Sequence, residues 1–350
     1  MTEEKQLILN MLKDGKITVE QASDLLEAIG DKKKSDTENL AGKISSTVDN
    51  IIKKATETIS GIDFDAIDIT NYNLKGEINS HKDFKVDDQI DYINVDIVNG
   101  DIIIEKSTDP GILISADVYS KKPNLTDYID VKIVDNKLNI SNNRDYNGVS
   151  ASLSLKISLD KDLYESLNIE NVNGKIEVAD TDFSTINIDT VNAKINLFNI
   201  KAAIDIDNVN GKIDIKNIDG KLAIDNVNGS VYLADLKGEL AEIDTVNGNV
   251  RVDGLKSDKL SVDSERGSIR VFTIKDTKEI ELETRNGNLV VDTAAYNGDV
   301  RAFVEGSSAN ITDKFVNKIK TDEGYEISTN NEKTDLEIKA ESVFGKISIR

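Results

Sequence analysis

Apolar residues recur in fixed columns from about residue 165 to residue 291, around a turn glycine that returns every 18 to 20 residues. Four of these columns hold Ile, Val, Leu or Ala, at seven and five positions before the turn and at two and four positions after it. Alternate apolar residues predict short strands with one buried face. The turn positions are Gly174, Ala193, Gly211, Gly229, Gly248, Gly267 and Gly287.

The length of the repeat decides the fold class. A period of about 19 residues is too short for a propeller blade or a helical repeat. Coils stacked at roughly 4.8 Å would instead join the apolar columns into one continuous core. The sequence therefore predicts a mainly β protein, with a parallel β-solenoid of the β-helix or β-roll type over residues 62–350.

The repeat becomes irregular outside this central region. Gly306, Gly324 and Gly345 continue the same step, and we expect them to mark further turns. Gly100, in VDIVNGDIII, marks an early coil. The interval from Gly100 to Gly174 is long enough for about four coils.

The first 30 residues have helical spacing instead. Asp14 and Gly15 separate two apolar clusters, and a capping box at Thr18 and Gln21 begins the second helix. Two helices this short need a partner, a second copy or the rest of the chain to pack against. Residues 1–30 are therefore predicted to be a helical hairpin that mediates interaction or oligomerisation. Its apolar residues are Leu7, Ile8, Met11, Leu12, Leu25 and Leu26.

Residues 31–61 are predicted to be a polar linker followed by an amphipathic helix. Six Lys and five acidic residues lie between positions 31 and 60. We expect the helix over residues 40–60 to cover the open end of the solenoid, with association to a membrane surface as the alternative. Its apolar residues are Leu40, Ile44, Val48, Ile51, Ile52, Ala55 and Ile59.

Composition and charge narrow the possible partners. The chain has no Trp and no Cys, so its core depends on many small aliphatic contacts and on no disulfide. Acidic residues outnumber basic ones by 64 to 43, which gives a net charge of -21. This balance argues against direct binding to nucleic acid and favours a basic partner or bound cations.

The N-terminus shows no secretory signal, because the acidic stretch from Met1 to Glu4 precedes apolar residues at helical spacing. No window reaches the 18 apolar residues that a membrane span needs. The sequence predicts a protein of the cytoplasm or of the membrane periphery, and leaves open surface exposure by a route without a signal peptide.

An asparagine column precedes the turn glycines. Stacked amides can hydrogen-bond from coil to coil and fix the register of the strands, and Asn tolerates the backbone of a turn. A row of amides that recognises a glycan is the alternative. The predicted ladder contains Asn173 with Gly174, Asn210 with Gly211, Asn228 with Gly229, and Asn247 with Gly248, together with Asn192 and Asn286.

An acidic column lies four positions before the turn and points away from the core. Calcium could bridge its like charges, but the calcium-repeat signature GGxGxD is missing, and Lys175, Lys194 and Lys212 lie nearby as counter-charges. We therefore predict a solvated face and no cofactor, with calcium as the alternative at Asp189, Asp207, Asp225, Asp244 and Asp263. The other members are Asp96, Glu170 and Glu283.

Signals for catalysis are poor. His81 is the only histidine and lies in INSHKDF, a segment that we expect to be a polar loop. Carboxylates recur in every coil, whereas a glycosidase site would interrupt the repeat at one place. Phosphate-binding glycine motifs are absent from the sequence. We predict that the protein is not an enzyme.

Two segments resemble known families. The opening EKQLILNMLKDGKITVEQASDLLEAIG resembles the helical hairpin at the N-terminus of LiaX/YvlB-like proteins of Gram-positive bacteria, which is related to the SHOCT class. Residues 90–350 resemble the β-strand-repeat domain named putative adhesin. The resemblance implies a role in cell-envelope stress responses, linked to membrane-disrupting peptides and regulatory membrane partners. It implies no reaction and transfers no functional residue.

The sequence thus predicts a non-enzymatic binding or regulatory protein. Its solenoid would be an acidic interaction scaffold and its hairpin an interaction module, with a cationic peptide or an envelope-stress membrane regulator as partner. The alternative is a structural or adhesive surface rod that binds an envelope polymer through calcium. A glycan-active β-helix enzyme is the third hypothesis.

Overall fold

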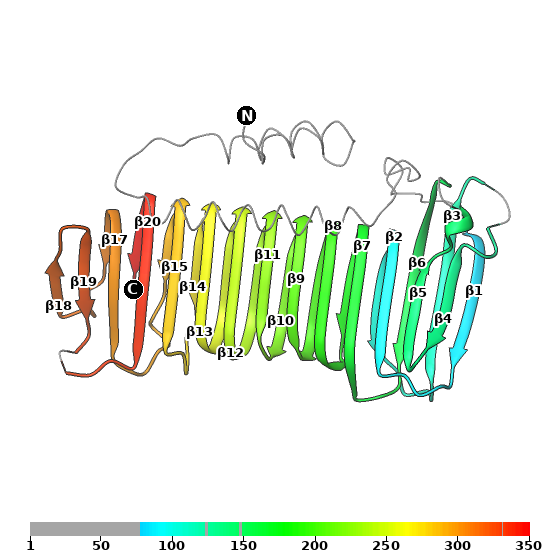
Figure 1. The fold of residues 1–350 in the computed structure, drawn as a ribbon. Helices are drawn as coiled ribbons and strands as arrows, with labels where there is room; N and C mark the ends of the chain where they lie inside the picture. The colour runs from blue at the N-terminus through cyan, green and yellow to red at the C-terminus, as the bar shows by residue number, and fades with distance from the viewer. Residues whose placement is uncertain (1–77, 123–124, 147–148, 331) are drawn as a thin grey trace.

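The structure is a computed structural model that describes residues 78–122, 125–146, 149–330 and 332–350. The predicted hairpin, the linker, the amphipathic helix and residues 62–77 lie outside the described residues. Within the described ranges, one sheet of 20 strands forms an elongated stack (Figure 1).

The strands vary in length from short edge segments to long strands that continue through a turn. They are β1 (Ile78–Val86), β2 (Tyr92–Lys106), β3 (Ile112–Ser120), β4 (Ile129–Val134), β5 (Lys137–Asn142), β6 (Ala151–Leu159), β7 (Leu163–Ala179), β8 (Asp182–Lys201), β9 (Ala203–Asn210), β10 (Ile213–Asp219), β11 (Leu222–Asn228), β12 (Val231–Asn247), β13 (Val250–Arg266), β14 (Ile269–Phe272), β15 (Glu279–Asn286), β16 (Leu289–Val291), β17 (Val300–Ile311), β18 (Asn317–Lys320), β19 (Gly324–Ser328) and β20 (Leu336–Ile349), with one short 3-10 helix, η3 (Arg144–Tyr146).

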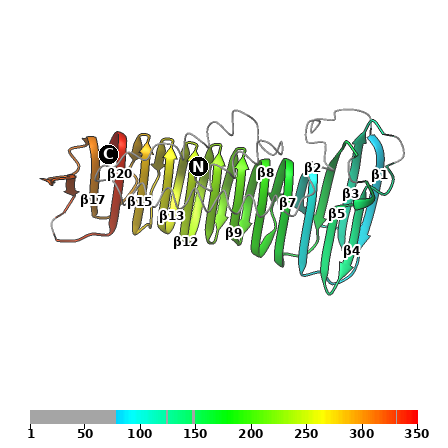
Figure 2. The same ribbon diagram turned by 45° about the horizontal axis from the view of Figure 1, so that its top comes forward.

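Parallel pairing between successive repeats confirms the predicted β-solenoid. Residues before each turn form one wall, in which β9 pairs with β8 and β11. Residues after each turn form the opposite wall, in which β10 pairs with β8 and β12. Figure 2 shows the coils following one another along the stack.

The four apolar columns form the core between the walls. Ile186 and Ile188 lie on one side of it, Ile195 and Leu197 lie on the other, and all four are buried. Each aligns with the equivalent residue of the next coil, as Ile186 does with Ile204. Alternation along each strand therefore leaves the intervening residues on the outward face.

The turn glycines are required by close contact between backbones. A Cβ atom on Gly229 would lie 1.9 Å from the carbonyl oxygen of Gly211, and Gly229 has a φ of 137°. A side chain here would need both a rare backbone conformation and a displacement of the neighbouring coil. Ala193 occupies the equivalent position in a coil where β8 continues through the turn.

A second turn follows the opposite wall in each coil, and its residues adopt the left-handed backbone conformation. Asn and Asp tolerate this conformation better than most residues. The sequence showed this turn only as a variable segment, because Asn, Asp, Gly and Thr alternate there. Its residues with φ between 51° and 82° are Asp180, Asn199, Asn217, Asp235, Gly254 and Thr273.

The coil count expected near the N-terminal end is wrong. The coil of Gly100 stacks directly on that of Gly174, because β2 pairs with β7. The residues between them leave the stack and form β3 to β6, in which β3 pairs antiparallel with both β1 and β6. The length of the interval between Gly100 and Gly174 did not give the number of coils, because the chain leaves the stack there and later returns to it.

A similar excursion occurs near the C-terminal end. β20 pairs with β15 and β16 on one side and with β17 on the other, so it lies between strands that precede it in the chain. Gly345 continues the turn column against Gly287. The same expectation is wrong for Gly306, which aligns with Ser342, and for Gly324, which begins the antiparallel strand β19.

Candidate functional site

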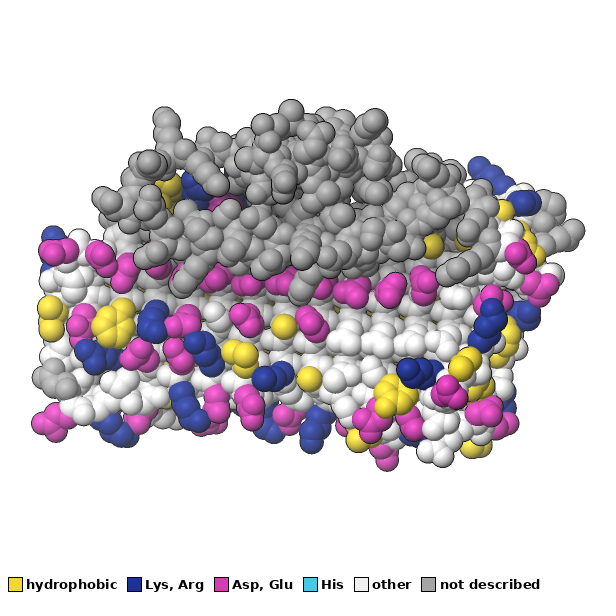
Figure 3. Space-filling model, viewed as in Figure 1, with side chains coloured by type: hydrophobic (Ala, Val, Ile, Leu, Met, Phe, Trp, Pro, Cys, Tyr) yellow, Lys and Arg dark blue, Asp and Glu magenta, His cyan; other side chains and the backbone are white. Residues whose placement is uncertain are grey.

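Acidic side chains lie in an unbroken line along the wall before the turn, and we call this line the acidic row (Figure 3). Parallel register pairs each member with the next, as Glu170 pairs with Asp96 on one side and with Asp189 on the other. In stack order the row contains Asp96, Glu170, Asp189, Asp207, Asp225, Asp244, Asp263, Glu283, Glu341 and Glu305.

The last two members of the row, Glu341 and Glu305, were not among the predicted residues. Glu341 lies four positions before Gly345, so extending the acidic column to that glycine would have identified it. Glu305 has no such signal, because its coil lacks the turn motif, and only its pairing with Glu341 places it in the row. Segments that leave the stack and return can therefore add a residue to the acidic row although the sequence repeat does not reveal it.

Like charges at this spacing affect one another. Burial, followed by the charges of Asp96 and Asp189, raises the pKa of Glu170 above its usual range. Burial, followed by the charges of Glu323 and Glu283, does the same for Glu305. A raised pKa means that the charged form of a carboxyl is disfavoured where it lies. Cations near these positions would lower that cost.

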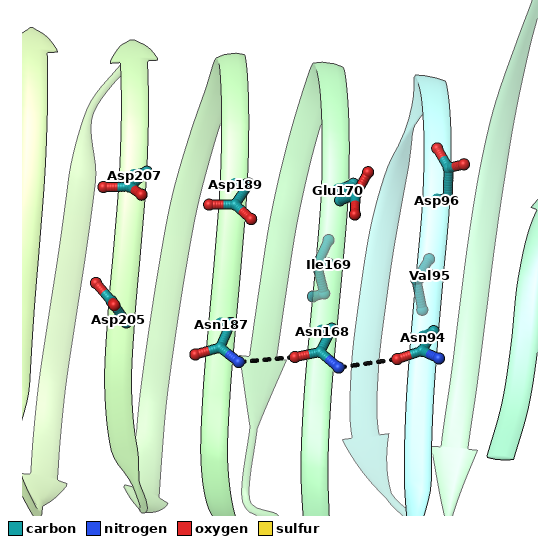
Figure 4. A pocket seen from close by; sticks show the side chains of 10 residues that line it. All are labelled: Asn94, Val95, Asp96, Asn168, Ile169, Glu170, Asn187, Asp189, Asp205 and Asp207. Carbon is teal, nitrogen blue, oxygen red and sulfur yellow. Dashed lines mark hydrogen bonds between the residues drawn. The ribbon is translucent and has the colours of Figure 1, made fainter. Parts of the chain in front are cut away.

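An open groove follows the row where the β2, β7, β8 and β9 strands lie side by side (Figure 4). Amides form its second line: Asn168 Nδ2 donates to Asn94 Oδ1 at 2.8 Å, and Asn187 Nδ2 donates to Asn168 Oδ1 at 2.7 Å. The groove therefore presents carboxylates beside hydrogen-bonded amides. Its lining is Asn94, Val95, Asp96, Asn168, Ile169, Glu170, Asn187, Asp189, Asp205 and Asp207.

The row is linear. Asp189, Asp207, Asp225, Asp244 and Asp263 follow one another, one in each coil. Across the described ranges, no three carboxylate or imidazole groups converge as a metal site would require. In the described ranges the row is thus a line of carboxylates and not a cluster around one point.

Two of the three lysines expected as counter-charges for this row pair with acids of the opposite wall. Lys175 Nζ lies 2.5 Å from Glu177 Oε1, and Lys212 Nζ lies 3.1 Å from Asp214 Oδ2. Residues directly after the turn belong to the opposite wall, so their side chains meet the acids of that wall. Proximity in the sequence was misleading because the turn reverses the chain between the two columns.

The asparagines before the turn form a continuous amide ladder. Each side-chain Nδ2 donates to the Oδ1 of the preceding coil, over distances of 2.7 to 3.1 Å. The ladder lies at the edge between the walls, where Arg266 takes the asparagine position in the coil of Gly267. Its members are Asn99, Asn173, Asn192, Asn210, Asn228 and Asn247.

His81 lies in strand β1, and not in the loop that the sequence suggested. Its Nδ1 is 2.7 Å from Asp117 Oδ1, and its Nε2 is 3.0 Å from Asp83 Oδ2. Hydrogen bonds to Asp117 and then to Asp83 raise the pKa of the imidazole. The alternation of polar and half-buried residues along INSHKDFKV is that of an edge strand, and it was the signal to follow.

The predicted interaction residues of the hairpin, Leu7, Ile8, Met11, Leu12, Leu25 and Leu26, lie outside the described residues. Of the segments that the structure does describe, none is a helix with the length and hydropathy needed to cross a membrane.

Two family models match the chain. The model described as SHOCT-like domain matches residues 3–34. The model described as Toastrack DUF4097 matches residues 90–350. A search of curated proteins found no match.

Several solved structures are similar to this chain. A putative adhesin from Bacteroides fragilis NCTC 9343 is 14% identical, with 77% of this chain and 96% of that chain covered and a TM-score of 0.36. A putative adhesin from Parabacteroides merdae ATCC 43184 is 13% identical, with coverage of 79% and 97% and a TM-score of 0.40. A putative lipid binding protein from Parabacteroides distasonis ATCC 8503 is 13% identical, with coverage of 77% and 96% and a TM-score of 0.38.

Proposed function

The chain belongs to the Toastrack DUF4097 family, and on that premise we propose that it is a non-enzymatic binding and regulatory protein whose solenoid presents the acidic row to a cationic partner. The observation that carries the proposal is the register of the row, which continues from Asp96 to Glu305 without an interruption. The stacked backbone fixes the carboxylates at roughly 4.8 Å intervals. A ligand with several cations can engage many of them at once.

The partner is a cationic peptide, or a basic segment of a membrane regulator of the envelope-stress response. This setting follows from the resemblance of the N-terminal hairpin and the repeat domain to LiaX/YvlB-like proteins. The hairpin is the second interaction module, and the protein acts in the cytoplasm or at the membrane periphery. Contacts with a cationic peptide weaken as salt is added, because exposed charges are screened.

The test is a calorimetric titration of the full-length protein with octalysine at low salt and at physiological salt. One variant combines Asp189→Asn, Asp207→Asn, Asp225→Asn and Asp244→Asn. A control with the same change in charge combines Glu177→Gln, Asp214→Asn, Asp219→Asn and Asp253→Asn on or beside the opposite wall.

We expect the row variant to lose at least about tenfold in affinity, and the control to change by less than about threefold. Equal losses in the two variants would reject a specific role for the row, because they would mean that octalysine responds only to net charge.

The alternative function is an adhesive rod that binds an envelope polymer through calcium. The observation that favours a rod is the single continuous stack from β2 to β20, in which successive coils bury one shared core. Calcium bridging predicts that millimolar calcium raises the thermal midpoint and that a chelator lowers it. The cationic-partner proposal predicts the same midpoint in both conditions.

A further inference from the structure

A second column on the outward face of the row wall is apolar. It lies two positions before the turn, where alternation turns side chains away from the core. We call it the valine stripe, and it consists of Val172, Val191, Val209, Val227 and Val246. The stripe runs parallel to the acidic row, two residues closer to the turn.

These valines are buried although they do not belong to the core. Each is at most 3% exposed, yet none is a member of the hydrophobic core cluster. The position before each valine is polar and buried, as at Asn208 and Asn226, and separates the stripe from the core. Burial this complete on an outward column means that a further layer of side chains covers it.

The covered zone continues beyond the last valine. Glu265 takes the next position of the column and is only 4% exposed. Its Oε1 lies 2.9 Å from Nη1 of Arg285, which follows in the next coil. A carboxylate on a bare outward face would remain hydrated, so the cover extends at least to this ion pair. From Val172 to Arg285 the column has six steps of roughly 4.8 Å, about 29 Å in all.

We infer that residues 40–59 of the same chain dock on the valine stripe as an amphipathic helix. The apolar positions of this segment, from Leu40 to Ile59, fall on one helical face. A helix of this length spans about 30 Å, which matches the covered column. The large aliphatic side chains on this helical face would form the layer that covers the valine stripe.

Charge and chain length fit the same occupant. Lys43 and Lys54 are eleven residues apart, close to three helical turns, so they border the same edge of the apolar face. When the helix lies on the stripe in the orientation that turns this edge toward the acidic row, both lysines meet carboxylates. Residues 62–77 can reach at most about 53 Å, enough to connect the helix to Ile78 at the start of β1.

The helix therefore has a docking surface along the side of the stack. The prediction that it covers an open end falls on residues outside the described ranges. Antiparallel strands finish the described stack at both ends, through β1, β3 and β6 and through β17 to β19. Docking itself does not require that the row binds any ligand.

The chain has no Cys, so a single introduced thiol reports on the cover directly. Val227→Cys places the thiol in the stripe, and Ala223→Cys on the same strand places it on the outward face outside the stripe. Each is made in the full-length chain with and without Val48→Asp and Ile52→Asp, which put charge on the apolar face of residues 40–59. The readout is the rate of reaction with a water-soluble disulfide reagent.

We expect the thiol at position 227 to react at least about tenfold more slowly than the thiol at position 223. The paired Asp substitutions should accelerate position 227 by at least about tenfold and leave position 223 unchanged. Val209→Cys repeats the measurement one coil away and guards against a local effect of one substitution.

Three outcomes would overturn the inference. A rate at position 227 that does not respond to Val48→Asp and Ile52→Asp would mean that another segment covers the stripe. Protection that grows with protein concentration would assign the cover to a second copy. Protection that appears only with anionic lipid vesicles would assign the stripe to a membrane surface.

Discussion

The two walls of the stack share one backbone architecture but differ in how one outward column distributes charge. On the wall after the turn, charges pair with neighbours two residues away, as Lys212 and Lys216 do around Asp214, or Arg251 does with Asp253. On the wall before the turn, the acidic row repeats the same charge in every coil. The parallel stack therefore does not require a column of one charge, and the acidic row is not a consequence of the fold.

The comparison separates stability from binding. Residues two apart on a strand share a face, so opposite charges at that spacing neutralise each other locally. Like charges aligned across coils repel, and burial, followed by the charges of Asp96 and Asp189, raises the pKa of Glu170. The pairs on the wall after the turn therefore bear on stability, whereas the role proposed for the acidic row is binding.

The largest effect is expected where both walls depend on the same turn. Gly229→Ala should lower the free energy of unfolding by more than about 2 kcal/mol, because its Cβ would lie 1.9 Å from the oxygen of Gly211. Ala193→Gly, in the same column, should cost less than about 1 kcal/mol. Thermal and urea unfolding would measure both, and equal losses would contradict the contact argument.

A paired carboxylate outside the row should have the next largest effect. Hydrogen bonds from Lys259 and then Lys339 lower the pKa of Glu281 to about 2. Because this pKa is depressed, the stabilising contribution is complete above the unfolded value of about 4.5 and is lost as the pH falls toward 2. Glu281→Gln should cost about 1 to 2 kcal/mol at neutral pH after allowance for solvent screening. An unchanged thermal midpoint at pH 7 would contradict it.

Neutralising a member of the row should act in the opposite direction. Glu170→Gln should raise the thermal midpoint at pH 7 by about 1 °C, because it removes a charge that burial disfavours and that Asp96 and Asp189 repel. Since the pKa of Glu170 is raised, lowering the pH through that pKa should stabilise the unmodified chain relative to this variant. A fall in the midpoint of Glu170→Gln at pH 7 would show that the charge is locally favourable.

The smallest effect concerns the pair of strands β1 and β3, where two carboxylates lie beside one imidazole. Hydrogen bonds to Asp117 and Asp83 raise the pKa of His81 above 6.5. Its contribution to stability is complete below the unfolded pKa and is lost as the pH rises through the folded pKa. The single histidine gives one imidazole signal in an NMR titration, and Asp117→Asn should lower its pKa. An unchanged pKa of His81 in this variant would contradict the hydrogen bond to Asp117.

The periodic part of the fold could be predicted from the sequence because each coil repeats the same inward pattern. Ile186, Ile188 and their equivalents identify the walls, and Asn173 with Gly174 identifies the turn. The excursions could not be predicted, because the spacing of the repeat reveals only the segments that keep that spacing. The interval between Gly100 and Gly174 holds antiparallel strands, and Gly306 lies beside Ser342.

The candidate site was predictable to a similar extent. The outward position of Asp189 and its neighbours follows from alternation, whereas Glu305 enters the row only through tertiary pairing. The partners of Lys175 and Lys212 depend on which wall follows the turn. The valine stripe has the sequence pattern of an ordinary buried column, and only its separation from the core distinguishes it.

The most direct test of the central claim is the shift in thermal midpoint that octalysine causes at low salt, because a ligand that binds the native state stabilises it. Octalysine should raise the midpoint of the unmodified chain and of the opposite-wall control that carries Glu177→Gln, Asp214→Asn, Asp219→Asn and Asp253→Asn. It should leave the midpoint of the row variant, which carries Asp189→Asn, Asp207→Asn, Asp225→Asn and Asp244→Asn, nearly unchanged. Equal shifts in all three proteins would contradict the assignment of binding to the acidic row.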